Sequence, residues 1–156
     1  MTLSLVRLDD RLVHGQVVVG WGRAIDVQLV VLVDDRVRAS DWEQELFRMG
    51  IPPEVDLTFA SVLEAIAAVP GWLASPLRTI IVTGDVDTLA RLVEGSEIRR
   101  VNIGGLHQQP HRRQRLPYVF LSDDEATRLE RLTARGVDVS AQDVPTAKPV
   151  PLAEFT

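Results

Sequence analysis

The sequence predicts a single α/β domain in which a doubly wound, mostly parallel β-sheet carries helices on both faces. Stretches with the composition of strands alternate with segments of helical periodicity along the whole chain. One of these stretches, 27–33, is apolar almost throughout, which is typical of a strand buried on both faces of a parallel sheet. Short helices between such strands indicate βαβ units.

Composition supports one globular domain. The 156 residues can bury a sizeable core, and because the chain has no internal repeat or long linker we take 1–156 as one domain. The net charge of −5 argues against nucleic-acid binding, and the absence of cysteine excludes disulfides and thiolate chemistry. No apolar run reaches the ~20 residues of a membrane span, and the N-terminus does not resemble a signal peptide. A cytoplasmic protein is therefore expected.

Seven strands are expected. Leu3, Leu5 and Leu8 alternate with polar residues at the start of the chain, which predicts a first strand. β-Branched and apolar runs predict the others, at 27–33, 55–59, 77–82, 100–103, 116–121 and 137–144. Leu152 and Phe155 are expected to anchor the proline-rich tail.

Helix boundaries are marked by capping boxes, in which a serine and a glutamate three residues later bond each other's backbone N–H groups. This spacing occurs at Ser40/Glu43, Ser61/Glu64 and Ser122/Glu125. The helices that follow are expected to end at Gly50, at Pro70-Gly71 and at Gly136. Two more helices are expected, one from Val17 and one from Val86 to Gly95.

The stretch from Asp9 to Val17 carries the residues most suited to chemistry. It joins the first expected strand to the first expected helix, and open α/β sheets bind ligands at such junctions. His14 supplies a titratable imidazole and Arg11 a guanidinium. The start of a helix adds unpaired N–H groups and the positive end of its dipole, both of which attract anions. The pattern predicts an anion site, with phosphate as the first candidate.

Two other loops are expected at the same edge of the sheet. Gly104 and Gly105 follow the strand 100–103, where they either make a tight turn or also line the phosphate site. Thr83 and Asp85 follow the strand 77–82, where they either touch substrate or cap the next helix.

A basic loop runs from 107 to 115. Pro110 interrupts the four-residue spacing of His107 and His111, so the pair does not match metal ligands on a helix. A solvated loop is expected, and its charge would also speed docking of an anionic partner. No metal site and no cofactor are expected.

The residues from Val6 to Val17 resemble the signature of IIB components of the mannose/sorbose class of the bacterial sugar phosphotransferase system (PTS). The stretches 92–95, 101–105 and 144–146 are similar to the same family and occur in register, so the resemblance spans nearly the whole chain. The loop 107–115 departs from it, because the family usually has a short lysine-containing segment there. The resemblance implies a mostly parallel α/β sheet with one antiparallel strand near an edge.

The resemblance also implies an activity. His14 receives a phosphoryl group on Nδ1 from a phosphohistidine of a IIA partner and passes it to a sugar bound by the membrane subunits IIC and IID, with no metal or cofactor. The protein would then be cytoplasmic and attached to the membrane through these subunits.

Phosphoryl transfer needs a nucleophile and positive groups around the equatorial oxygens. Imidazole is neutral and nucleophilic near physiological pH, and Arg11 is expected to bind the phosphoryl oxygens. Asp9 or Asp10 either accepts a hydrogen bond from the second imidazole nitrogen or holds Arg11. Further donors are expected at the helix start, from the backbone N–H groups of Gly15, Gln16 and Val17.

Two other functions fit the same residues. One is a regulatory module that is phosphorylated on His14 but takes no part in transport. The other is an α/β domain that binds an anion without transferring a phosphoryl group. The sequence leaves sugar specificity and homo-oligomer formation open.

Overall fold

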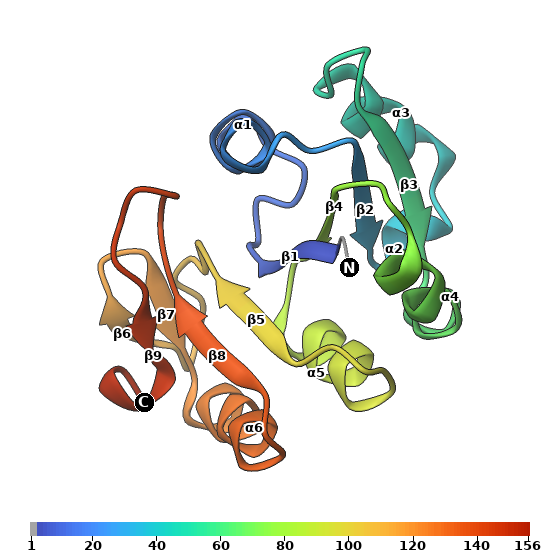
Figure 1. Cartoon of the computed structure of the whole chain (residues 1–156). Helices are drawn as coiled ribbons and strands as arrows, with labels where there is room; N and C mark the ends of the chain where they lie inside the picture. The colour runs from blue at the N-terminus through green and yellow to red at the C-terminus, as the bar shows by residue number, and fades with distance from the viewer. Residues whose placement is uncertain (1–2) are drawn as a thin grey trace.

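Seven strands form one sheet in the computed structural model, which describes residues 3–156 and, for Gln16, the backbone alone (Figure 1). The strand order is β3-β2-β4-β1-β5-β8-β9. All neighbouring pairs are parallel except β8 and β9. The strands are β1 (Leu3–Leu8), β2 (Leu29–Val33), β3 (Asp56–Ala60), β4 (Thr79–Thr83), β5 (Arg100–Ile103), β8 (Asp138–Ala141) and β9 (Val150–Pro151). The predicted doubly wound, mostly parallel sheet is confirmed.

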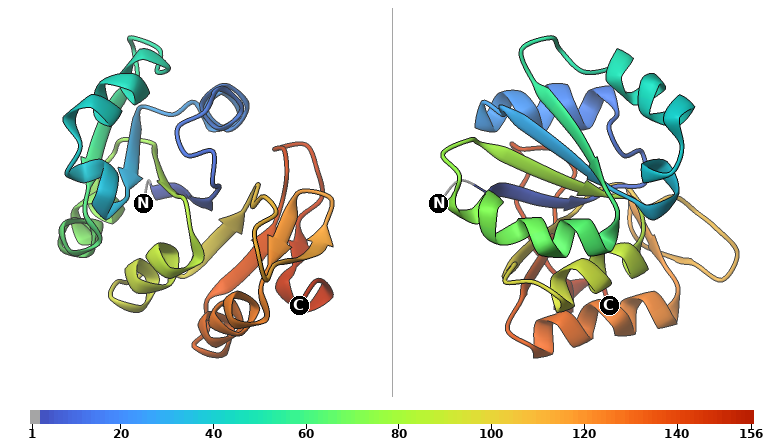
Figure 2. Two further views of the ribbon diagram at one scale, coloured as in Figure 1. Left: turned by 180° about the vertical axis from the view of Figure 1, so that it is seen from behind. Right: turned by 90° about the vertical axis from the view of Figure 1, so that its right-hand side faces the viewer.

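Helices cover both faces of this sheet (Figure 2). One face carries a π-helical segment, η1 (Gln16–Trp21), continued by α1 (Gly22–Ile25), and α3 (Asp41–Met49). The opposite face carries α4 (Val62–Ala74), α5 (Val86–Glu94) and α6 (Asp123–Ala134). Two short helices, α2 (Asp35–Arg38) and η2 (Leu152–Glu154), complete the set in residues 3–156. Within this range no helix combines the length and apolar character needed to cross a bilayer.

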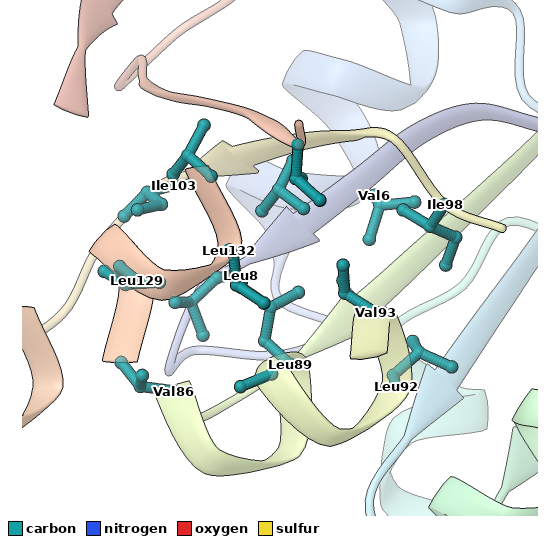
Figure 3. Packing of buried hydrophobic residues seen from close by; sticks show 14 of the residues in the cluster. Val6, Leu8, Val86, Leu89, Leu92, Val93, Ile98, Ile103, Leu129 and Leu132 are labelled. Carbon is teal, nitrogen blue, oxygen red and sulfur yellow. The ribbon is translucent and has the colours of Figure 1, made fainter. Parts of the chain in front are cut away.

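Each face of the sheet has its own apolar core. On the α4–α6 side, Leu89, Leu129 and Leu132 are fully buried against strand residues such as Leu8 (Figure 3). On the other side, Val17, Val18 and Trp21 of η1 pack on β2 and β4. Leu152 and Phe155 are buried in the first core, so the predicted anchoring of the tail is confirmed.

Three predicted details of the helices and strands are wrong. Helix α4 continues past Pro70 to Ala74, because Trp72 and Leu73 pack on the core beyond the proline. Ser40 makes no side-chain cap to α3, since Glu43 pairs with Arg36 instead. The capping boxes of α4 and α6 are confirmed.

The third error is the expected strand 116–121. The chain instead forms a separate antiparallel hairpin of β6 (Arg113–Leu116) and β7 (Val119–Leu121). A turn at Pro117 and Tyr118 splits the apolar run, because proline cannot donate to a sheet ladder. The short antiparallel strand β9 was not located by the residue pattern, although the family resemblance implied one.

Strand β1 lies at the point where the chain connections diverge. The helix after β1 packs on one face of the sheet, whereas α5, which follows the adjacent β4, packs on the other. Such a switch point leaves a crevice beyond the carboxyl ends of the strands. The loops after β1, β4 and β5 therefore meet at one edge, as predicted.

Candidate functional site

The loop from Asp9 to Gly15 connects β1 to η1 and carries His14. It is tied to its neighbours by main-chain hydrogen bonds, from Asp9 N–H to the Thr83 carbonyl and from Asp10 N–H to the Gly105 carbonyl, both 2.9 Å long. His14 is exposed, and its carbonyl accepts a 3.0 Å bond from Val18 N–H in the first helical turn. The imidazole thus lies at the predicted strand-to-helix junction.

An apolar anchor holds the same loop from below. Leu12 is buried and has a φ of 56°, a left-handed conformation that is unfavourable for a leucine. Gly84 makes room for it, because a Cβ on that glycine would lie 2.8 Å from Leu12 Cδ2. Burial of the leucine side chain stabilises the strained backbone two residues before His14.

The Arg11 guanidinium is oriented by the Asp9 carboxylate. Arg11 Nε donates to Asp9 Oδ1 at 2.9 Å and Nη2 donates to Oδ2 at 2.7 Å, while the Arg11 backbone N–H donates to Oδ1 at 3.1 Å. The Asp9 side chain is fully buried, whereas that of Arg11 is 27% exposed. Of the alternatives that the sequence left open, Asp9 is therefore the residue that holds Arg11.

A second guanidinium, from Arg7, lies beneath this pair and was missed by the sequence analysis. Arg7 is fully buried, and its Nη2 donates to Asp9 Oδ2 at 3.2 Å. Its Nη1 donates to the side-chain oxygen of Asn102, which the parallel register places beside Arg7. The Arg7 Cζ lies 4.7 Å from the ring centre of Trp21 in η1. The only hint in the sequence is a charged residue between Val6 and Leu8 in an apolar strand.

The same guanidinium holds the loop between β8 and β9. Arg7 Nη1 donates to the Gln142 carbonyl at 2.9 Å and Nη2 to the Asp143 carbonyl at 3.1 Å. Val144 and Pro145 follow and, with Arg11 and Trp21, line a cavity of about 150 Å³. A larger groove of about 930 Å³ on the face of β5 and β8 is lined by neither His14 nor Arg11. The small cavity is the hollow that adjoins the predicted site.

Ion pairing shifts the pKa values of the cluster. Burial alone raises the pKa of Asp9, but the hydrogen bonds from Arg11 and the charge of Arg7 outweigh it, so the pKa lies below its ordinary value. Burial lowers the pKa of Arg7, and Asp9 offsets part of that shift. The hydrogen bond to Asp9 raises the pKa of Arg11. The carboxylate and its partners are charged at neutral pH.

The lowered pKa of Asp9 predicts acid sensitivity. Since the pKa of the unfolded form is about 3.9, the stabilising contribution of Asp9 is complete above that pH and is lost as the pH falls through the lower folded value. Urea unfolding from pH 6 down to pH 2 should therefore show the free energy of unfolding falling below about pH 4. The fall should be shallower in Asp9→Asn, and parallel curves for the two proteins would contradict the prediction.

Asp10 is engaged by His107. The Asp10 carboxylate accepts the His107 backbone N–H at 2.7 Å, and its Oδ1 lies 2.6 Å from His107 Nδ1. The Asp10 side chain is 19% exposed and that of His107 is 69% exposed. Asp10 thus joins the loop after β1 to the loop after β5, a contact that the sequence analysis did not foresee.

The basic loop is less solvated than predicted. The Arg112 side chain is only 6% exposed and bonds both carboxylate oxygens of Glu125, at 2.9 and 2.8 Å. Arg115 is 10% exposed and bonds the Leu121 carbonyl. Arg113, which is 70% exposed, matches the expectation. The carboxylate at the start of α6 draws the loop inward, so a docking role for Arg112 is not supported.

Gly104, the first of the two glycines after β5, makes room for the arginine cluster. A Cβ on Gly104 would lie 2.1 Å from Arg7 Nη2, and one on Gly105 would lie 3.4 Å from Arg11 Nε. Their amides are used within the protein, since Gly104 N–H donates to the Leu8 carbonyl and Gly105 N–H to Asp9 Oδ2. Gly104 therefore admits the Arg7 guanidinium, whereas a Cβ on Gly105 would be in ordinary van der Waals contact with Arg11.

Thr83 lies in the interior, whereas the N-cap of η1 lies at the surface. Thr83 is fully buried, and its carbonyl holds the Asp9 backbone. Gly15 is exposed at the N-cap of η1, and Gln16 and Val17 form the first turn, where helical N–H groups lack partners within the helix. The predicted donors of residues 15–17 thus adjoin His14. In the part of the chain that the structure describes, no cluster of His, Asp or Glu could hold a metal ion.

Comparisons with known proteins show which family the chain resembles. A family model described as "PTS system sorbose subfamily IIB component" matches residues 3–156. The chain is 36% identical over 147 residues to the N-acetylgalactosamine-specific phosphotransferase enzyme IIB component 1 of Escherichia coli (strain K12), covering 92% of this chain and 91% of that protein. It is 29% identical to the PTS system mannose-specific EIIAB component of the same strain, covering 94% of this chain but 46% of that longer protein.

The fold is shared with solved structures. The crystal structure of the PTS system N-acetylgalactosamine-specific IIB component 1 from Escherichia coli matches with a TM-score of 0.87 and 32% identity, over 96% of this chain and 98% of that one. The match of the family model over nearly the whole chain, together with this shared fold, identifies the chain as a member of the sorbose subfamily of PTS IIB components, a family of phosphotransferases.

Proposed function

We propose that His14 carries a phosphoryl group from a phosphohistidine on a IIA partner to a sugar bound by the membrane subunits IIC and IID. The observation that carries this proposal is the exposed His14 imidazole in a loop whose Arg11 guanidinium is held by buried Asp9. Membership of the PTS IIB family supports the reaction class. No metal or cofactor takes part in the proposed reaction.

The chemistry follows from the groups present. In the first step the His14 imidazole attacks the phosphorus, a new N–P bond forms, and the donor imidazole leaves with the electron pair of its broken N–P bond. In the second step a sugar hydroxyl attacks the phosphorus and forms a new O–P bond, the His14 N–P bond breaks with its electron pair returning to the imidazole, and the hydroxyl proton passes to solvent. Arg11 and the N–H groups of residues 15–17 stabilise the equatorial oxygens in both steps.

The partners are proposed from the family. The mannose-specific relative is named as an EIIAB component and is about twice as long as the matched region, which supports a IIA domain as the donor. The relatives are named for different sugars, including N-acetylgalactosamine, mannose and sorbose, so the acceptor is proposed only as a sugar. In this role the protein works in the cytoplasm against the membrane subunits.

Phosphoryl labelling tests the proposal. Labelled phosphoenolpyruvate, the general phosphocarriers and a matching IIA should place acid-labile phosphate on the wild type and none on His14→Ala. A matched control is His111→Asn, because His111 is exposed and Asn tolerates its φ of 71°. Label retained by His14→Ala would overturn the assignment of the acceptor.

A further arm tests the transport step. Membrane vesicles with IIC and IID are added to the labelled protein with candidate sugars. Transfer of label from His14 to a sugar supports the transport role, whereas a stable phosphoprotein with every sugar would favour the regulatory alternative.

A further inference from the structure

Arg7, Asp9 and Arg11 form an ion-paired cluster of two guanidinium groups and one carboxylate, and this imbalance suggests a task for Arg7. The Asp10 and Asp143 carboxylates also act on Arg11, from outside these ion pairs. Asp9 and Arg11 alone would form a neutral pair, because the carboxylate that orients Arg11 also cancels its charge. We propose that Arg7 is a positioning residue for the phosphoryl site: its buried charge offsets that of Asp9, so that the cluster presents one net positive charge at Arg11. This inference rests on the proposed function of His14.

The Asp9 carboxylate accepts hydrogen bonds from both arginines. Oδ2 accepts Nη2 of Arg7 at 3.2 Å from below and Nη2 of Arg11 at 2.7 Å from the outer side. Arg7 and Asp9 are fully buried, and only Arg11 reaches the surface. Since the buried pair is shielded from solvent, its charges act on the surface group with little screening.

Arg7 also contacts the elements on both sides of His14. Its Nη2 bonds Asp9 before the histidine, and its guanidinium lies over Trp21 in the helix that begins after the histidine. Burial of charged groups is costly, and apolar side chains of similar volume in place of a whole buried ion pair are often at least as stabilising. The task of holding the strands together is therefore by itself a weak reason for a guanidinium near the end of β1.

A role of Arg7 through its charge and a purely structural role predict different phosphate affinities for the double variant of Arg7→Met and Asp9→Asn. With Arg7, Asp9 and Arg11 charged, the cluster sums to one positive charge. Arg7→Met reduces the sum to zero, Asp9→Asn raises it to two, and the double variant restores one. Asn keeps an acceptor oxygen for Arg11, and Met keeps the length of the apolar stem. If Arg7 served only to hold these elements together, the double variant would bind phosphate no better than Arg7→Met.

Inorganic phosphate is the probe, and its binding is followed by NMR at the Gly15 amide, with the rate of His14 phosphorylation as a second measurement. Arg7→Met should lower phosphate affinity and transfer rate about tenfold, as expected for the loss of one unit charge at an effective dielectric constant of ~20. The double variant should return to within about threefold of the wild type, and Asp9→Asn should bind phosphate more tightly than the wild type.

The series distinguishes the failure of this inference from failure of the proposed function. Equal phosphate affinities across folded variants, or a double variant no better than Arg7→Met, would overturn the role of Arg7 even if His14 is phosphorylated. Absence of label on wild-type His14 would overturn the proposed function, while the phosphate series would still report on Arg7. If Arg7→Met does not fold, Asp9→Asn and the double variant make the same comparison, and equal affinities for these two contradict the inference.

Discussion

Replacement of Asp9 by alanine is expected to lower the free energy of unfolding by roughly 3–5 kcal/mol. The carboxylate is fully buried and accepts hydrogen bonds from Arg7, Arg11 and the Gly105 amide. Alanine would leave the Arg7 guanidinium buried without its counter-ion, and an uncompensated buried charge is among the most costly changes in a protein interior. Urea denaturation at pH 7 measures the loss.

The neighbouring acid supplies the control for this experiment. Asp10 pairs with the exposed His107, and such solvent-accessible pairs contribute roughly 0–1 kcal/mol. Asp10→Ala should therefore cost far less stability than Asp9→Ala, although the two residues are adjacent in sequence. Similar losses for the two variants would show that the buried network does not stabilise the fold as described.

The substitution Gly104→Ala should lower the free energy of unfolding by roughly 3 kcal/mol, because it forces a methyl group into the arginine cluster. The new Cβ would lie 2.1 Å from Arg7 Nη2 and 2.7 Å from Asp9 Oδ2. Neither group can move freely, since the guanidinium is also held by Asn102 and by the Gln142 carbonyl. Thermal or urea unfolding would measure the effect.

Gly105→Ala is the matched control, because beyond its two chain neighbours its Cβ would meet no atom closer than 3.4 Å. It should cost less than about 1 kcal/mol. A second control combines Gly104→Ala with Arg7→Met: the flexible methionine should relieve the clash, so the combined loss should be smaller than the sum of the two single losses. Additive losses would contradict the contact as the cause.

Local patterns predicted most elements of the fold. The apolar run at 27–33 became β2, and the capping boxes at Ser61 and Ser122 begin α4 and α6, because these signals depend only on residues close in sequence. The same reasoning failed at Pro70, where packing of Trp72 and Leu73 continues the helix beyond the proline. It also failed at 116–121, where a turn inside an apolar run makes a hairpin.

The residues of the loop after β1 were predicted in the same way, and His14 is exposed at the edge of the sheet as expected. Its role as phosphoryl acceptor stays a prediction, as do the roles of Arg11 and of the N–H groups of residues 15–17. The division of labour between the two aspartates was left open. The fold decides which of them holds Arg11, since Asp9 faces inward to Arg7 and Arg11 while Asp10 binds His107.

The sequence by itself determined the alternation of most strands and helices along the chain and the polar loop that carries His14, because periodicity and caps are local properties. The resemblance of a long motif to a known family implied the reaction class. Only the tertiary structure decided that Arg7 is buried and where its charge is balanced. Its partners Asn102 and Gln142 are 95 and 135 residues away along the chain. The parallel register of β1, β5 and β8 brings them together, and no local pattern records which distant strands become neighbours.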